Sequence, residues 1–329
     1  MSACRGDRYH AAVSDDARRG ESLEAMLGRF PAVAQRVRRI YGLRLPRHVA
    51  VFAALWASVQ HDPAERAALD YLGLRPWGVS DYFGDGGLEL AGRDGLDERL
   101  HGRFRRDPAE FVTVMSGDTD GLHFGLWYDD PAEPPTFIAH NYARDSAETW
   151  TDGFSTLLDE MHWHIGRVFA DYGQDGEEGT LLQPLLGALE WFAAPTQQAL
   201  AVDGTSRWAG VDRPAGSVSV FPVLPQGSGD PRVAQARERL AGFQIGSSEA
   251  AGWIADAERE LAAGLPAYAL AVGGELHWLD RDEYRRAGLD LLVGAYRALG
   301  RDALAEIAEV HATHRDLPRV DVLARSEGR

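Results

Sequence analysis

Lysine is absent from this chain of 329 residues, so all 34 of its basic residues are arginine. Without lysine, the chain cannot use the lysine of a nucleotide-hydrolase P-loop or form the Schiff base of aldolases and pyridoxal-phosphate enzymes. Its single cysteine, Cys4, excludes an internal disulfide and a cysteine-based zinc site. The abundance of arginine and alanine suggests a GC-rich bacterial genome.

Long hydrophobic runs are also missing. No apolar run approaches the roughly 20 residues that a membrane-spanning helix requires, and no signal peptide is visible at the N-terminus. We therefore expect a cytoplasmic protein without a membrane partner. The net charge of −16 makes DNA, RNA and anionic membrane surfaces poor partners, whereas a basic protein would be tolerated.

Several motifs that would identify an enzyme are lacking. We find no Gly-x-Ser-x-Gly elbow, paired-histidine metalloprotease helix, EF-hand loop or dinucleotide glycine fingerprint. The glycine-rich stretch at residues 81–95 is not followed by a helix with a lysine, so it predicts a hairpin or surface loop. His162 and His164 are two apart and do not face each other on a helix, so no shared metal is predicted. No cofactor is expected.

The segment at residues 104–144 predicts an antiparallel meander. Its three strand-like runs are rich in β-branched and aromatic residues and span Phe111–Ser116, Leu122–Tyr128 and Thr136–Tyr142. Gly117-Asp118 marks the first turn, and Pro134-Pro135 breaks the chain before the third run. The meander is the expected centre of the fold.

The middle run alternates between two faces. Leu122, Phe124, Leu126 and Tyr128 point toward one face, which we expect to cover a core. The other face carries His123, Trp127 and Asp129, and with Asp118 these are candidate binding residues for a partner or ligand. The alternative is that Trp127 lies under a helix and Asp129 closes the turn at Asp129-Asp130-Pro131.

Hydrophobic periodicity predicts helices around the sheet. They span Ser22–Tyr41 (with an interruption at Pro31), Arg47–Gln60, a short helix after Asp62-Pro63, Thr151–Tyr172, Thr180 to Pro195, Asp230–Phe243, Ser247–Leu261, Asp282–Leu299 and Asp302–His314. A short strand is expected at Ser217–Val223. Gly273-Gly274 predicts a β-hairpin over Ala267–Leu279, because glycine accepts the positive φ of a tight turn. The predicted fold class is α+β, with small antiparallel sheets (meander and hairpin) surrounded by helices.

The expected domain organisation has four parts. Residues 1–20 form a disordered N-terminus, and residues 21–173 form an N-terminal α+β half that contains the meander. Residues 180–315 form a C-terminal α+β half, and residues 316–329 form a tail. The polar run Gln174–Gly179 is the candidate boundary between the halves.

Four segments resemble the histone PARylation factor family, the accessory proteins that complete the active site of poly-ADP-ribose polymerases. They occur in the family's order. They are Tyr41–Pro46 with its following aromatic helix, Leu72-Gly73-Leu74 with Gly78, Leu100–Phe111 with Gly117-Asp118, His123, Gly125, Asp129 and Pro131, and Leu291–His311. The third is the most specific, because it places rare residues at matching spacing.

The resemblance implies a non-enzymatic accessory protein that acts with an ADP-ribosyltransferase-like partner. In animal members an Asp-Glu pair supplies the carboxylate that activates the acceptor serine; the matching place here is Arg259-Glu260, which retains only the glutamate. Glu260 is therefore the candidate catalytic residue. The family's Tyr-Arg pair, which helps to dock the polymerase, falls near Phe221-Pro222, so the resemblance implies that this contact is lost.

Two alternatives remain open from the sequence. Residues 40–165 also resemble the SUKH superfamily of toxin-immunity proteins, through a leucine-proline bend, a Gly-Asp turn and a strand such as His123–Pro131. That resemblance implies a binding protein that neutralises a toxin. The other alternative is a free-standing enzyme that uses acidic residues around Glu260 or Asp129.

Overall fold

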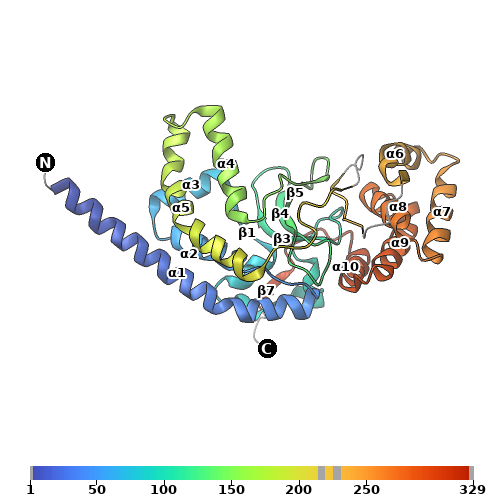
Figure 1. The fold of residues 1–329 in the computed structure, drawn as a ribbon, viewed down its shortest axis with the longest axis horizontal. Coiled ribbons are helices and arrows are strands. Elements are labelled where there is room, and N and C mark those ends of the chain that lie inside the picture. The colour runs from blue at the N-terminus through green and yellow to red at the C-terminus, as the bar shows by residue number, and fades with distance from the viewer. Residues whose placement is uncertain (1–2, 214–218, 225–230, 326–329) are drawn as a thin grey trace.

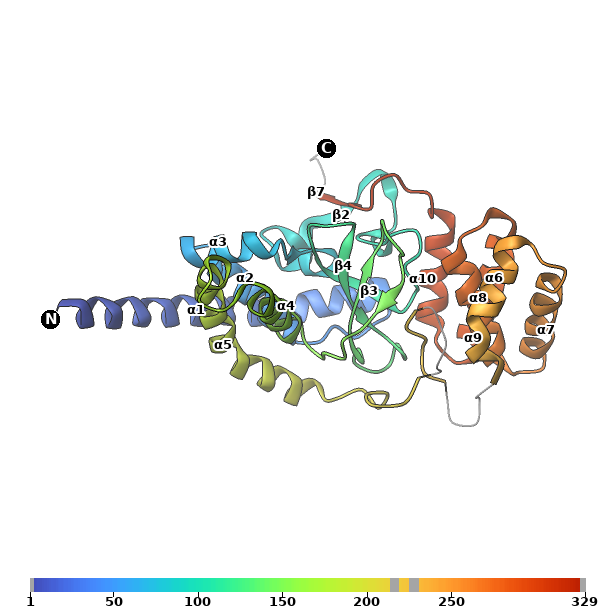
Figure 2. The ribbon, with the colours of Figure 1, turned by 90° about the horizontal axis from the view of Figure 1, so that it is seen from above.

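The structure, a computed structural model, describes residues 3–213, 219–224 and 231–325. Helices lie on both sides of a small antiparallel sheet (Figure 1). The predicted α+β class, with a small antiparallel meander among helices, is confirmed. The sheet forms the middle of the molecule, and the N-terminal and C-terminal groups of helices are at its two sides (Figure 2).

The central sheet has the strand order β1-β3-β4-β5-β6. Its strands are β1 (Arg75–Pro76), β3 (Phe111–Ser116), β4 (Leu122–Trp127), β5 (Phe137–Tyr142) and β6 (Thr149–Trp150). The three predicted strands of the meander agree with β3, β4 and β5 to within one residue at each end. Aromatic residues pair across the strands, with Trp127 opposite Phe111 on one side and Phe137 on the other.

Both faces of the meander are buried. The predicted alternation is confirmed, because Leu122, Phe124, Leu126 and Tyr128 belong to the main hydrophobic core. The opposite face forms a second apolar cluster around Trp127, made with Phe111, Phe137 and Ala139. Every residue of β3 and β4 is buried, so neither face of these strands is left to solvent.

The N-terminal group contains α1 (Ala3–Tyr41), α2 (His48–Val59), α3 (Pro63–Leu72), α4 (Leu157–Tyr172) and α5 (Glu177–Asp203). The predicted interruption at Pro31 is wrong: α1 is continuous and includes most of the residues expected to be disordered. Because proline has no backbone N–H, the carbonyl four residues before Pro31 lacks its helical hydrogen bond. Pro31 is exposed, so water can bond to that carbonyl instead. α5 likewise continues past Pro195, where a stop was predicted.

The C-terminal group contains α6 (Ala236–Ile245), α7 (Ala250–Ala262), α8 (Pro266–Leu279), α9 (Arg285–Ala298) and α10 (Asp302–Thr313). The predicted hairpin over Ala267–Leu279 is wrong, because this segment is α8. A Cβ atom on Gly273 would lie 2.9 Å from Leu292 Cγ and 3.0 Å from its backbone nitrogen, in α9. Gly273 therefore permits close packing of two helices instead of a turn.

The remaining elements connect the two groups. A second sheet pairs β2 (Leu90–Gly92) with β7 (Leu323–Arg325), so the end of the chain returns to the N-terminal half. Of the predicted strand Ser217–Val223, the first two residues lie outside the described residues, and residues 219–223 are not a strand. Short 3₁₀ helices span Gly78–Phe83, Gly87–Glu89, Arg93–Gly95, Glu98–Leu100, Pro231–Gln235 and Asp282–Tyr284.

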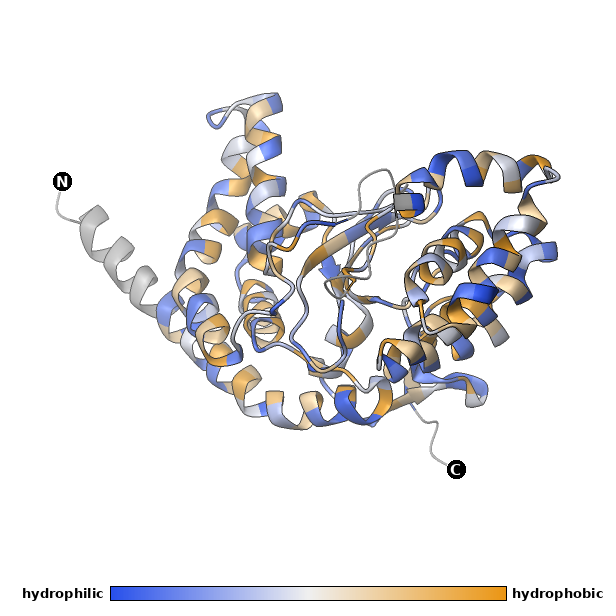
Figure 3. Ribbon diagram, turned by 45° about the vertical axis from the view of Figure 1, so that its right-hand side comes forward, coloured by the Kyte–Doolittle hydropathy of each residue, from blue (hydrophilic) through white to orange (hydrophobic). Residues whose placement is uncertain are grey.

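Hydrophilic and hydrophobic residues alternate along the longer helices, as expected of helices that cover a core on one side (Figure 3). In the part of the chain that the structure describes, no helix combines the length and the apolar character needed to cross a membrane.

Candidate functional site

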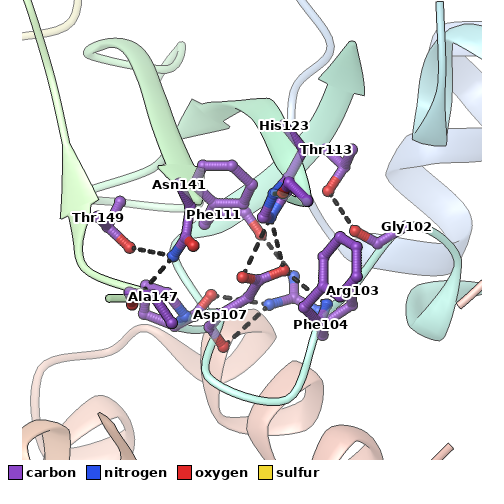
Figure 4. Close-up of polar contacts among 12 residues, drawn as sticks. Gly102, Arg103, Phe104, Asp107, Phe111, Thr113, His123, Asn141, Ala147 and Thr149 are labelled. Carbon is purple, nitrogen blue, oxygen red and sulfur yellow. Dashed lines mark hydrogen bonds and ion pairs between the residues drawn. The ribbon is translucent and has the colours of Figure 1, made fainter. Parts of the chain in front are cut away.

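His123 lies in a buried polar network at the end of the sheet (Figure 4). Its Nε2 atom is 3.1 Å from each carboxylate oxygen of Asp107, and its Nδ1 atom is 2.8 Å from the carbonyl oxygen of Gly121. Arg103 donates to the carbonyl oxygens of Pro108, at 2.7 Å, and Phe111, at 2.6 Å. These contacts hold the loop before β3 against the sheet, so His123 supports the fold and is not accessible to a ligand.

Asp129, at the end of β4, fixes the segment that follows α5. Its carboxylate accepts hydrogen bonds from Arg213 at 2.9 and 2.6 Å, Thr136 Oγ1 at 2.6 Å and the Val223 amide at 2.8 Å. Burial alone would raise the pKa of Asp129, but these bonds and the charge of Arg213 hold it below its usual value. Asp129 thus connects the chain after β4 to the segment that contains Arg213 and Val223. This role goes further than the closing of a turn that the sequence predicted as an alternative.

The predicted binding residues are not brought to one surface. His123, Trp127 and Asp129 are each 0% exposed. The ring of Trp127 stacks on Phe137 at a centroid distance of 5.9 Å, inside the second apolar cluster. Asp118 alone is exposed, at the turn between β3 and β4. A partner can therefore contact Asp118 directly, whereas the other three would act only through the shape of the sheet.

Glu260 lies near the C-terminal end of α7 with its side chain 22% exposed. Both of its carboxylate oxygens are 2.6 Å from Nη2 of Arg232. The Arg232 guanidinium lies 4.0 Å above the ring of Tyr268, which orients it. Asp256 is one helical turn before Glu260 and pairs with Arg259 at 2.5 Å. The arrangement presents an oriented, partly exposed carboxylate that is paired with an arginine, with a second acidic residue one helical turn away.

The segment expected to have lost a polymerase contact is largely buried. Phe221 is 9% exposed, and its carbonyl oxygen accepts a hydrogen bond of 2.6 Å from Arg213. Phe221 and Pro222 line a cavity between the sheet and α8. No sequence spacing could have indicated Arg213, because it lies 84 residues from Asp129.

A group able to hold a metal lies between β5 and α4. His140, Asp152 and Glu160 each offer one ligand atom, and these atoms lie within 4.8 Å of one another. Burial, and then the charges of Asp152 and Asp159, raise the pKa of Glu160 to about 8. Burial lowers the pKa of His164 to about 4. The sequence reasoning considered His162 with His164 and missed the informative spacing, which is Glu160 and His164, four apart on one helix face.

Comparison with known proteins supports one of the two resemblances. Residues 32–180 match the family model of Histone PARylation factor 1. The chain is 26% identical to Histone PARylation factor 1 of Mus musculus over 309 residues, which cover 88% of each chain. It is 30% identical to Histone PARylation factor 1 of Danio rerio over 111 residues, covering 33% of this chain and 31% of the relative. The similarity thus covers most of the chain in one relative, and the family model matches its N-terminal part.

Proposed function

We propose that this chain is a member of the histone PARylation factor 1 family, and that it is an accessory protein of a poly-ADP-ribose polymerase-type transferase and not an enzyme by itself. The observation that carries the proposal is the alignment with the Mus musculus relative, which runs along 88% of both chains. A match of this extent includes both groups of helices and the sheet between them. The bacterial origin and cytoplasmic location expected from composition remain predictions.

The geometry at Glu260 supports a contribution to the partner's active site. Its carboxylate is partly exposed and oriented by Arg232, and a general base must reach the proton that it removes. Here that proton would be on the acceptor hydroxyl held by the transferase. Asp256 offers the second carboxylate that position 259 lacks, because residues four apart on a helix are neighbours.

Docking would then use the side of α7 that carries Glu260. Phe221 and Pro222 line an internal cavity and leave little surface for a polymerase. The net charge of −16 favours a partner or acceptor peptide with basic residues, and such attraction increases the association rate at low salt.

A binding titration tests the accessory role. The full chain is titrated into the catalytic domain of a poly-ADP-ribose polymerase, and the heat of binding and the mass of the complex are measured. We expect a one-to-one complex whose affinity falls as salt is added. The absence of a complex at concentrations of about 100 μM would contradict the proposal.

The SUKH-type immunity role predicts that the chain binds a toxin and forms no complex with the polymerase. None of the matches reported above is to that superfamily, so no observation favours it. Co-expression with the product of a neighbouring toxin gene distinguishes the two: rescue of growth without any binding to a transferase would replace our proposal with the immunity role.

A further inference from the structure

We propose that His140, Asp152 and Glu160 form a binding site for a divalent transition-metal ion of the Zn²⁺ type. The three residues come from β5, from the segment after β6 and from the first turns of α4. With His164 they line a pocket of about 380 Å³ between the sheet and α4. The site is separate from Glu260 and does not depend on the proposed accessory function.

The spacing of the side chains fits a shared ion better than hydrogen bonds. His140 Nδ1 is 3.6 Å from Asp152 Oδ2, and His164 Nε2 is 3.6 Å from Glu160 Oε1. Both separations are longer than a nitrogen–oxygen hydrogen bond. Two ligand atoms that each lie about 2.1 Å from one tetrahedral Zn²⁺ are about 3.4 Å apart. These two pairs are therefore close to the separation that a common ion would impose, and the ligand atoms of His140, Asp152 and Glu160 all lie within 4.8 Å of one another.

Glu160 supplies the second, independent observation. Its side chain is 1% exposed, yet neither carboxylate oxygen has a hydrogen-bond partner among the described residues. Nε2 of His164 also has no hydrogen-bond partner there. Burying a carboxylate without a hydrogen bond or a full opposite charge is costly, and such groups usually pair or bind a metal. A divalent cation would supply the missing charge and use the free lone pairs.

The ligand types select the class of ion. One or two imidazoles with two carboxylates and no thiolate suit Zn²⁺ and other late first-row ions, whereas Mg²⁺ and Ca²⁺ prefer oxygen ligands alone. His164 lies beside Glu160 and lines the same pocket. Such an ion would connect β5, the segment after β6 and α4. Because it would bind the folded chain and not the unfolded one, it would raise the stability of the folded chain.

The test uses the full chain without a histidine tag, stripped with a chelator and returned to metal-free buffer. Zn²⁺ binding is measured by titration calorimetry, and Co²⁺ binding by its visible absorption spectrum. We expect one ion per chain and a rise in melting temperature on adding Zn²⁺. Glu160→Gln should weaken binding by about 100-fold and abolish the rise. His162→Ala is the matched control, because His162 is exposed on the same helix, and it should bind as tightly as the wild type.

The metal-free melting temperature separates loss of a ligand from loss of the fold. Glu160→Gln removes a buried acidic group that accepts no hydrogen bond from the described residues, so the metal-free variant should melt at the wild-type temperature or above it. If the metal-free Glu160→Gln variant melts at a lower temperature than the wild type, His140→Ala, which removes the ligand on β5, is used to compare Zn²⁺ affinity and melting temperature instead. Equal Zn²⁺ affinity in wild type and in both ligand variants, or an equal loss in His162→Ala, would overturn the proposal.

Discussion

Asp129, which is fully buried, and Arg213, whose side chain is 19% exposed, form an ion pair that holds the segment after α5 against the end of the sheet. Breaking a buried pair leaves one uncompensated charge in the interior, whereas exposed pairs contribute little. The neighbouring Asp130 pairs with Arg207, whose side chain is 61% exposed. Two adjacent aspartates should therefore differ greatly in their contribution to stability.

Asp129→Asn is expected to lower the free energy of unfolding by about 3–5 kcal/mol at pH 7. Asp130→Asn, the control, should lower it by less than about 1 kcal/mol. The pKa of Asp129 is lower in the folded than in the unfolded chain, so its contribution is present above the unfolded value near 3.9 and is lost as pH falls through the folded value. Urea unfolding at pH 7 and pH 3 measures these free energies. If both variants lose the same free energy of unfolding at pH 7, the ion pair with Arg213 does not make the expected contribution.

His48 is a buried histidine whose two ring nitrogens have no hydrogen-bond partner among the described residues. Burial lowers its pKa to about 3, so it is neutral in the folded chain at pH 4–7. The unfolded chain binds a proton at this residue below about pH 6.5, which favours unfolding. As the pH falls from about 6.5 to about 3, His48 therefore lowers the free energy of unfolding by about 1.4 kcal/mol for each pH unit.

His48→Leu should remove that dependence. The substitution replaces an unpaired polar ring with an apolar side chain, so the variant should be at least as stable as the wild type at pH 7 and more stable at pH 5. Melting temperatures measured from pH 4 to pH 8 test this. If the difference in melting temperature between the wild type and His48→Leu stays constant with pH, the folded chain binds a proton at His48 as readily as the unfolded chain does.

At the scale of elements, Gly273 and Gly274 distinguish a helix from a turn. A Cβ atom at Gly273 would meet Leu292 and the backbone of α9, whereas one at Gly274 would meet nothing within 4 Å. Both residues are in α8. We expect Gly273→Ala to destabilise the chain by about 1–3 kcal/mol through overpacking, and Gly274→Ala to stabilise it by up to about 1 kcal/mol. In a hairpin, both substitutions would destabilise; that result, by thermal unfolding, would contradict α8.

The meander was predictable because its signal is local. Phe111–Ser116 is rich in β-branched and aromatic residues and ends at Gly117-Asp118, and Leu122–Trp127 alternates in hydrophobicity. Both strands, and the two faces of the second one, therefore follow from neighbouring residues. The burial of the second face was not predictable, since the residues that cover it, such as Val220 and Arg213, are far away in the chain. Gly273-Gly274 was misread for the same reason: its packing partner is in α9.

At the scale of the whole molecule, the chain passes between its two groups of helices more than once. After α5, the segment near Arg213 crosses the sheet edge toward the C-terminal helices, and after α10 the chain returns so that β7 pairs with β2. In both Figure 1 and Figure 2, α10 lies nearer to the sheet than α7 does. α7 is thus at the outer side of the C-terminal group.

The measurement that tests the accessory role most directly is serine ADP-ribosylation of a histone peptide by a polymerase catalytic domain, with and without this chain. The wild type should direct modification to serine. Glu260→Gln, which keeps the shape and removes the charge, should abolish serine modification while one-to-one binding to the polymerase is retained. Glu258→Gln, at an exposed position on the same helix, should behave as the wild type. Full serine modification with Glu260→Gln, or none with the wild type, would contradict the account.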